Sequence, residues 1–129
     1  MVEINLICYL RGDDFSEADI EKSTGFKIHK VTSHKKLNIP IKTYQKVVSI
    51  IPEEDNIYSD NYNILIKNFS DLFKDKVEII KASVCENITL LAEVKYVDHC
   101  NMSLDRKVIE SVDVSFYSFD ITCYEVEKF

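Results

Sequence analysis

The sequence has little glycine, with Gly12 and Gly25 the only two among 129 residues. A P-loop and a dinucleotide-binding fingerprint each need several glycines within a few positions, so both routes to nucleotide binding are excluded. The chain also has two prolines and no tryptophan. This scarcity of turn residues argues against a loop-dominated or disulfide-scaffold fold.

Long apolar runs are absent as well. No run approaches the roughly 20 residues that span a membrane, and the opening Met1-Val2-Glu3-Ile4 lacks the basic and apolar regions of a secretory signal. We therefore expect a cytoplasmic protein that has no membrane partner. The four cysteines form no CxxC pair, and Cys8 and Cys123 lie in alternating apolar runs, which predicts reduced, buried thiols rather than disulfides.

Residues that could carry chemistry do not form a recognisable set. His99 and Cys100 are adjacent and Cys85 lies nearby, but none has a second ligand at zinc-binding spacing. Two carboxylate clusters, Asp13-Asp14 and Glu53-Glu54-Asp55, lie where strands are expected to end, so a role in turns is favoured over acid–base catalysis or divalent-ion binding. We predict no metal, no cofactor and no enzymatic activity.

Charge is distributed unevenly along the chain. The net charge is −6, yet the segment from Lys27 to Lys46 holds six lysines, two histidines and no acidic residue. The rest of the chain is therefore strongly acidic. Such a surface repels phosphate backbones and attracts basic proteins, which disfavours nucleic acid and favours a basic protein partner.

The alternation of apolar and polar residues predicts three strands, over residues 2–11, 88–96 and 114–126. A run of β-branched and aromatic residues predicts a fourth strand over residues 43–51. The lysine-rich segment 27–42 has no sustained period and contains Pro40, so it is predicted to be a long surface loop.

Capping residues and three- and four-residue spacing predict the helices. Ser16 is expected to cap a short helix to about Ser23 that Gly25 ends. Ser59 is expected to cap the longest helix, and Ser103 a short one. Residues 77–84 fit a further helical turn or two, or the start of a strand. The long helix carries Tyr62, Leu65, Ile66, Phe69, Leu72 and Phe73.

These elements predict a single α+β domain over residues 1–129. Its 46% hydrophobic content is enough for one core. We expect a mainly antiparallel sheet of four to five strands with two to three helices packed on one face. The opposite face would then serve as a binding surface or be merely solvated. It would expose Asn5, Tyr9, Arg11, Glu93, Lys95, Asp120, Thr122 and Tyr124.

Two short motifs carry a family resemblance. The segment Tyr9 to Ser16, leading into a helix ended by Thr24-Gly25-Phe26, and the closing segment Phe119 to Tyr124 resemble a bacterial family catalogued as domain of unknown function 4279. The resemblance implies a compact α+β domain and a bacterial setting. It implies no activity and no catalytic residues.

The function predicted from these observations is non-enzymatic binding. The first hypothesis is an immunity protein that neutralises a basic, nuclease-type bacterial toxin by direct contact. The alternative is a module that binds a small molecule or a peptide on the open sheet face or at the lysine-rich segment. The oligomeric state is left open, with a homodimer as one alternative. The predicted partner-binding residues are Tyr9, Arg11, Asp13, Asp14, Glu93, Asp120 and Tyr124.

Overall fold

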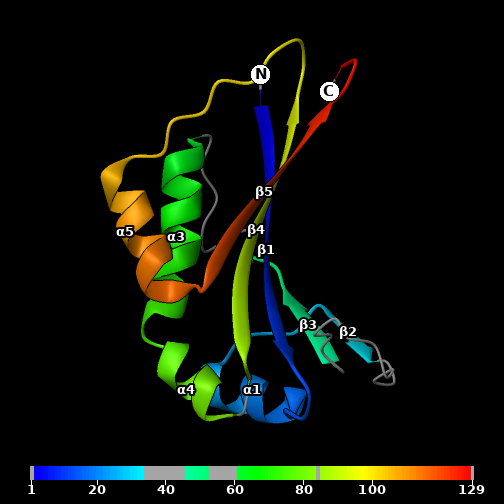
Figure 1. Ribbon diagram of the computed structural model, residues 1–129, viewed down its shortest axis with the longest axis vertical. Coiled ribbons are helices and arrows are strands. Elements are labelled where there is room, and N and C mark those ends of the chain that lie inside the picture. Colours follow the sequence, from blue (N-terminus) through cyan, green and yellow to red (C-terminus); the bar gives the residue numbers. More distant parts are fainter. Residues whose placement is uncertain (1, 34–45, 53–60, 84, 129) are drawn as a thin grey trace, which may run out of the picture.

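The computed structural model describes residues 2–33, 46–52, 61–83 and 85–128 (Figure 1). The described residues form five strands and four helices, and they confirm the α+β fold class. In chain order these elements are β1 (Val2–Gly12), α1 (Glu17–Thr24), β2 (Lys30–Ser33), β3 (Lys46–Ile50), α3 (Tyr62–Lys74), α4 (Val77–Ala82), β4 (Asn87–Tyr96), α5 (Arg106–Ser115) and β5 (Ser118–Glu125).

One sheet holds all five strands in the order β2-β3-β1-β4-β5. The long strand β1 is central and pairs antiparallel with both β3 and β4, and β2 pairs antiparallel with β3. The last pair, β4 with β5, is parallel. The sheet is thus mainly antiparallel, as predicted, with one parallel pair.

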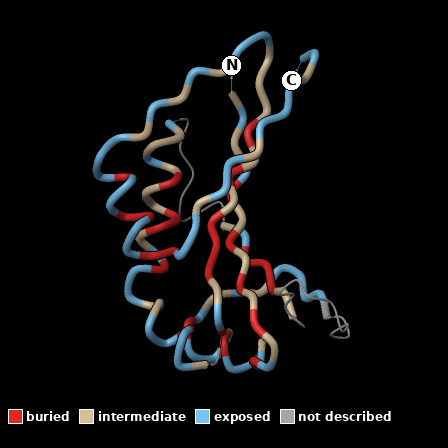
Figure 2. Tube along the Cα trace, in the orientation of Figure 1, coloured by how far each residue is buried: buried red, intermediate tan, exposed pale blue. Residues whose placement is uncertain are grey.

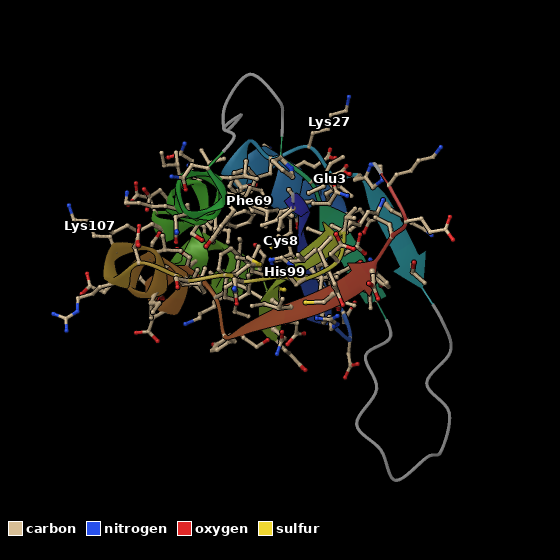
Figure 3. All side chains as sticks on the ribbon, turned by 90° about the horizontal axis from the view of Figure 1, so that it is seen from above. Glu3, Cys8, Lys27, Phe69, His99 and Lys107 are labelled. Atoms are coloured by element: carbon tan, nitrogen blue, oxygen red, sulfur yellow. The ribbon has the colours of Figure 1, made fainter. Side chains whose placement is uncertain are left out.

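Helices α3 and α5 lie beside one face of the sheet, while α1 and α4 lie together at one end of it (Figure 1). The buried residues concentrate between these helices and the strands (Figure 2). Seen from above, Phe69 of α3 and Cys8 of β1 lie between the helix and the sheet, and Lys107 points outward from α5 (Figure 3). The alternation in β1 is confirmed because Leu6, Cys8 and Leu10 are all buried.

Phe73 of α3 lies at the centre of an aromatic group. Its ring centroid is 4.5 Å from that of Phe26, 5.2 Å from that of Phe69 and 5.2 Å from that of Phe116. These rings come from α3, from the segment after α1 and from the end of α5. Stacked and edge-on rings in a core add to the stabilisation from burial alone, so this group joins the helix layer together.

The predicted start and end of the first helix are confirmed. The Ser16 hydroxyl accepts a hydrogen bond from the Asp19 amide at 3.3 Å, and Gly25 adopts a left-handed conformation with φ 77°. For α3, however, the cap is Asn61, whose side-chain oxygen accepts from the Asn63 amide at 2.9 Å. The predicted cap, Ser59, lies outside the described residues and is not the N-cap.

The predicted cap of α5, Ser103, is also wrong. Asp105 precedes the first turn of α5, and Ser103 instead bonds the start of α3. The amide of Ser103 donates to the Tyr62 hydroxyl at 2.8 Å, and its carbonyl accepts from the Asn63 side chain at 2.9 Å. These contacts join the beginnings of the two helices, so tertiary bonding overrides the local capping preference.

The last strand begins later than predicted, because Val114 lies in α5 and β5 starts at Ser118. Val114 has a strand-favouring side chain, but the buried residues Val108, Ser111, Val112 and Ser115 follow a helical period. The ambiguous segment after α3 is the helix α4, not a strand.

The lysine-rich segment is not entirely a loop. Lys30–Ser33 forms the edge strand β2, in which Val31 pairs with Val48 and Thr32 with Val47. A segment of four residues is too short for its alternation to predict a strand. Lysine is compatible with this strand because an edge position leaves the lysine side chain in solvent. Residues 34–45, which hold the rest of that prediction and the first residues of the strand predicted over 43–51, lie outside the described residues.

Within the described parts of the chain, no helix is both long enough and apolar enough to cross a bilayer.

Candidate functional site

Five of the seven predicted partner-binding residues share the open face of the sheet. Tyr9 and Arg11 belong to β1, Glu93 to β4, and Asp120 and Tyr124 to β5. Residues in antiparallel or parallel register point to the same face, and the pairing Cys8 with Leu90 places buried residues together on the opposite face. The structure thus brings these five residues onto one surface.

Tyr9 and Arg11 form a direct contact at one end of this face. The guanidinium carbon of Arg11 lies 5.0 Å from the centre of the Tyr9 ring. Tyr9 lies between Ser49 of β3 and Thr89 of β4 in the sheet. A cation above an aromatic ring orders both side chains, so this end presents a fixed aromatic and cationic pair.

The middle of the face is more apolar than predicted. Ile7 pairs with Leu91 across β1 and β4, and Leu91 lies next to Asp120 of β5. Glu93 is one step further along, between Asn5 and Thr122. The alternating pattern already placed Ile7 and Leu91 on this face, but the prediction named only polar and aromatic residues there.

Tyr124 lies toward the opposite end, next to Lys95, which also pairs with Glu3. Arg11 is opposite Asn87 and Tyr124 is level with Lys95, so eight positions of β4 separate them. At the rise of a strand this is about 26 Å. The five residues therefore mark a long surface rather than one compact pocket.

Asp13 and Asp14 do not lie on the sheet face. They follow β1 in the turn that leads to α1. The amide of Glu86 donates to the Arg11 carbonyl at 3.0 Å, which brings a further acidic residue to the same end of β1. The first turn of α1 adds Glu17 and Asp19. We call Asp13, Asp14, Glu17, Asp19 and Glu86 the acidic end.

Within the acidic end, Glu17 is paired with a lysine. The ammonium of Lys46 donates to the Glu17 carboxylate at 2.7 Å and to the Phe15 carbonyl at 2.7 Å. This hydrogen bond is the main reason why the pKa of Glu17 is below its ordinary value. The contact joins the start of β3 to the start of α1.

A groove opens on the same sheet face next to β2. It encloses about 340 Å³ and lies beside Tyr9, which connects it to the candidate surface. Its walls are partly apolar, with one histidine and one lysine. The lining residues are Ile7, Tyr9, His29, Lys30, Thr32, Val47, Ser49 and Ile51. Sequence reasoning missed this groove because it depends on the pairing of β2 with β3.

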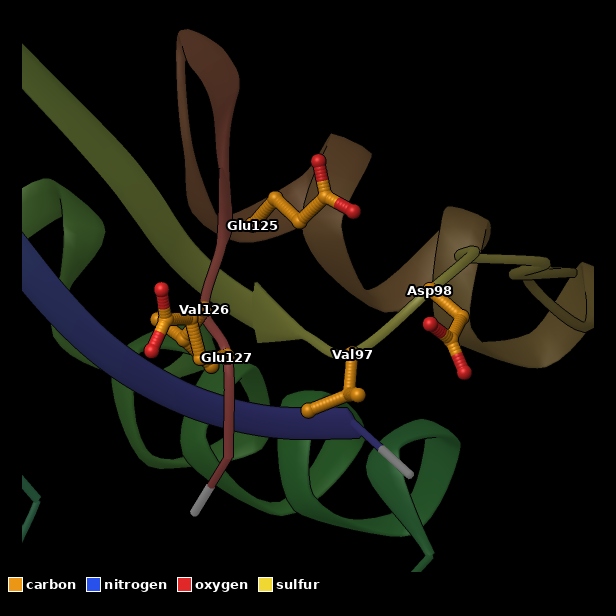
Figure 4. Close-up of a pocket in the computed structure, with 5 residues that line it drawn as sticks. All are labelled: Val97, Asp98, Glu125, Val126 and Glu127. Carbon is orange, nitrogen blue, oxygen red and sulfur yellow. The ribbon is translucent and has the colours of Figure 1, made fainter.

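A second hollow of about 430 Å³ lies where β4 and β5 end, lined by Val97, Asp98, Glu125, Val126 and Glu127. The carboxylates of Asp98, Glu125 and Glu127 point in different directions (Figure 4). The described residues contain no group of three histidine, cysteine, aspartate or glutamate side chains placed to hold a metal ion. This hollow therefore offers no metal centre.

The cysteines divide into buried and accessible thiols. Burial raises the pKa of Cys8 well above its usual range and raises that of Cys85 to about 11. Both thiols therefore stay protonated at neutral pH, where they are poor nucleophiles. Cys123, predicted to be buried, is exposed. It lies on β5, which pairs with β4 alone in the described part of the chain.

Comparison with known proteins identified no protein similar to this chain. No family model, no curated protein and no solved structure matches this chain. The resemblance to domain of unknown function 4279 stays a prediction. The candidate site consequently depends on geometry alone, and that site is the open sheet face from Arg11 to Tyr124.

Proposed function

We propose that this chain is a non-enzymatic binding protein whose open sheet face binds a protein with a basic surface. The observation that carries the proposal is the row of residues from Arg11 to Tyr124 that share the open face over about 26 Å. A surface of this length suits a protein partner better than a small molecule, which needs an enclosing pocket.

The composition of the face supports a protein interface. Ile7 and Leu91 form an apolar centre beside Tyr9, and charged residues such as Glu93 and Asp120 surround it. Protein interfaces commonly combine an apolar, aromatic centre with a polar rim.

The charge of the chain supports a basic partner. The sheet face carries lysine and arginine as well as acidic residues, and the acidic end lies immediately beyond Arg11. Acidic groups bordering an interface accelerate association with a basic partner and orient it. The most specific form of the proposal is a cytoplasmic immunity protein that covers a basic, nuclease-type bacterial toxin.

Calorimetry against nuclease-type toxin domains from the same host tests this proposal. We expect binding that weakens as salt rises, and at least a roughly tenfold loss of affinity for Tyr9→Ala and for Glu93→Lys. Glu110→Lys on α5 is the matched control, because Glu110 is exposed on the helix layer. Equal affinity for all three variants, or no bound toxin domain at low salt, would contradict the proposal.

The groove beside β2 favours a second candidate, the binding of a small anionic ligand or of a peptide carboxylate. Its volume of about 340 Å³ is within the range of ligand sites, and His29 and Lys30 supply donors at its rim. A thermal-shift panel of organic anions tests this candidate. A ligand at one hundred times its Kd should add about 2.7 kcal/mol of stability, and Lys30→Ala should reduce the shift.

A further inference from the structure

The strand β5 forms one edge of the sheet, and in the described part of the chain its partner is β4 alone. Six of its eight residues are exposed, and the other two are half-buried. An edge strand presents a row of backbone amides and carbonyls that face away from the sheet, and another strand can pair with them.

The two edges of this sheet are built differently. Natural edge strands are commonly protected by being short, or by carrying lysine, proline or a bulge. The edge β2 is four residues long and begins with Lys30. By contrast, β5 is eight residues long and contains no lysine, proline or glycine. It also exposes 48% of Ile121 and 47% of Tyr124, so it is suited to accept another strand.

We propose that β5 pairs antiparallel with β5 of a second copy of this chain, about a two-fold axis at Thr122, and so joins two five-stranded sheets into one. In this register Thr122 faces itself, Ile121 faces Cys123, and Asp120 faces Tyr124. The sequence of the strand supplies a suitable neighbour at each position. Threonine pairs and apolar pairs stabilise neighbouring strands, and the phenol of Tyr124 can donate to the Asp120 carboxylate.

Charge and apolar pairing argue for this register over two shifted ones. No two acidic residues face each other when the axis lies at Thr122, because Glu125 faces Phe119. An axis at Asp120 places that carboxylate opposite itself, and an axis at Cys123 places Ile121 opposite Glu125. Like charges directly opposite each other destabilise a strand pair. Any two-fold axis perpendicular to the sheet, including the one at Thr122, keeps both helix layers on one side of the joined sheet.

Sedimentation velocity over a dilution series, on the full chain, tests the proposal. We expect wild type to approach twice its 15.0 kDa mass as concentration rises. Ile121→Lys with Cys123→Lys places two lysine pairs opposite each other across the axis, so dimerisation should weaken roughly tenfold or more. Ile109→Lys is the control, because Ile109 is 54% exposed on α5 and should leave the dimer unchanged.

A charge reversal tests the register. Ile121→Lys combined with Cys123→Glu should restore the dimer, because each lysine then faces a glutamate of the other copy. Circular dichroism confirms that every variant folds. The proposal is overturned by a wild type that stays monomeric at every concentration, by dimers that persist in the double-lysine variant, or by a lysine–glutamate variant that stays monomeric.

Discussion

The hydroxyl of Ser115 on α5 donates a hydrogen bond to the backbone carbonyl of Ser70 on α3, at 2.8 Å. The hydroxyl of Ser70 itself is fully buried and has no hydrogen-bond partner among the described residues. The two serines therefore have opposite effects at the same helix contact. One joins the helices, and the other keeps an unsatisfied polar atom in the core.

Ser70→Ala should stabilise the protein, by about 1 kcal/mol, because it removes a buried hydroxyl that has no partner and introduces a better helix former. Ser115→Ala should lower stability by about 1 kcal/mol, because the Ser70 carbonyl loses its donor. Urea unfolding of both variants measures the two changes. Loss of stability in Ser70→Ala would show that its hydroxyl finds a partner in solution.

Asp71 of α3 makes stability depend on pH. Partial burial alone would raise its pKa, but hydrogen bonds from Lys67 and Ser111, both at 2.6 Å, outweigh burial and hold the pKa below its ordinary value. A lowered pKa in the folded state means that the stabilisation is present above the unfolded pKa of about 3.9. It is lost as pH falls through the folded value.

Asp71→Asn should therefore destabilise the protein at pH 7, by about 1 kcal/mol after allowance for solvent screening of the half-buried carboxylate. The difference from wild type should shrink as pH falls below the unfolded pKa. Chemical unfolding across a pH series measures it. Asp113→Asn, an exposed change on α5, is the control. A difference that stays constant with pH would contradict this account.

Gly25 ends α1 with φ 77°, and a Cβ there would meet no atom within 4 Å. The cost of Gly25→Ala is thus conformational rather than steric crowding, and it should be about 1 kcal/mol. Gly25→Asn should cost less, because asparagine tolerates the left-handed region. Thermal unfolding of the two variants ranks them. Equal melting temperatures would mean that α1 ends differently in solution.

Thiol accessibility should follow burial. At low protein concentration, Cys123 should react first with a chromogenic disulfide reagent and half-buried Cys100 more slowly. Cys8 and Cys85 should stay unlabelled until the protein unfolds, because burial keeps both thiols protonated and inaccessible. Mass spectrometry of labelled peptides identifies the sites. Rapid labelling of Cys8 would contradict the described packing of β1.

The sequence predicted the elements with a strong period. The alternation in β1 and the apolar spacing in α3 each place apolar side chains on one face. In both elements that face is the buried one, so the local pattern was enough to predict the element. Predictions failed where a distant contact decided the outcome. Ser103 bonds Tyr62 rather than capping α5, and β2 forms because β3 lies next to it. No local pattern carries such information.

The candidate surface was predictable only in part. Alternation identified which side chains of β1, β4 and β5 share a face, and five of the seven predicted residues lie there. The order of the strands was not predictable, so the groove beside β2 was not foreseen. Asp13 and Asp14 follow β1 in the turn where the sequence placed them, and they do not share the sheet face with the other five. The parallel pairing of β4 with β5 depends on α5, which carries the chain back along the sheet.

The pairing of β1 with β4 also limits when the sheet can form during translation. Val2 pairs with Tyr96 and Arg11 with Asn87, so β1 leaves the ribosome long before its partner β4 exists. Pairing between segments so distant in the chain requires closing a large loop, which slows folding. During synthesis, β1 must wait with one backbone edge unpaired, and the sheet can be completed only after most of the chain has been translated.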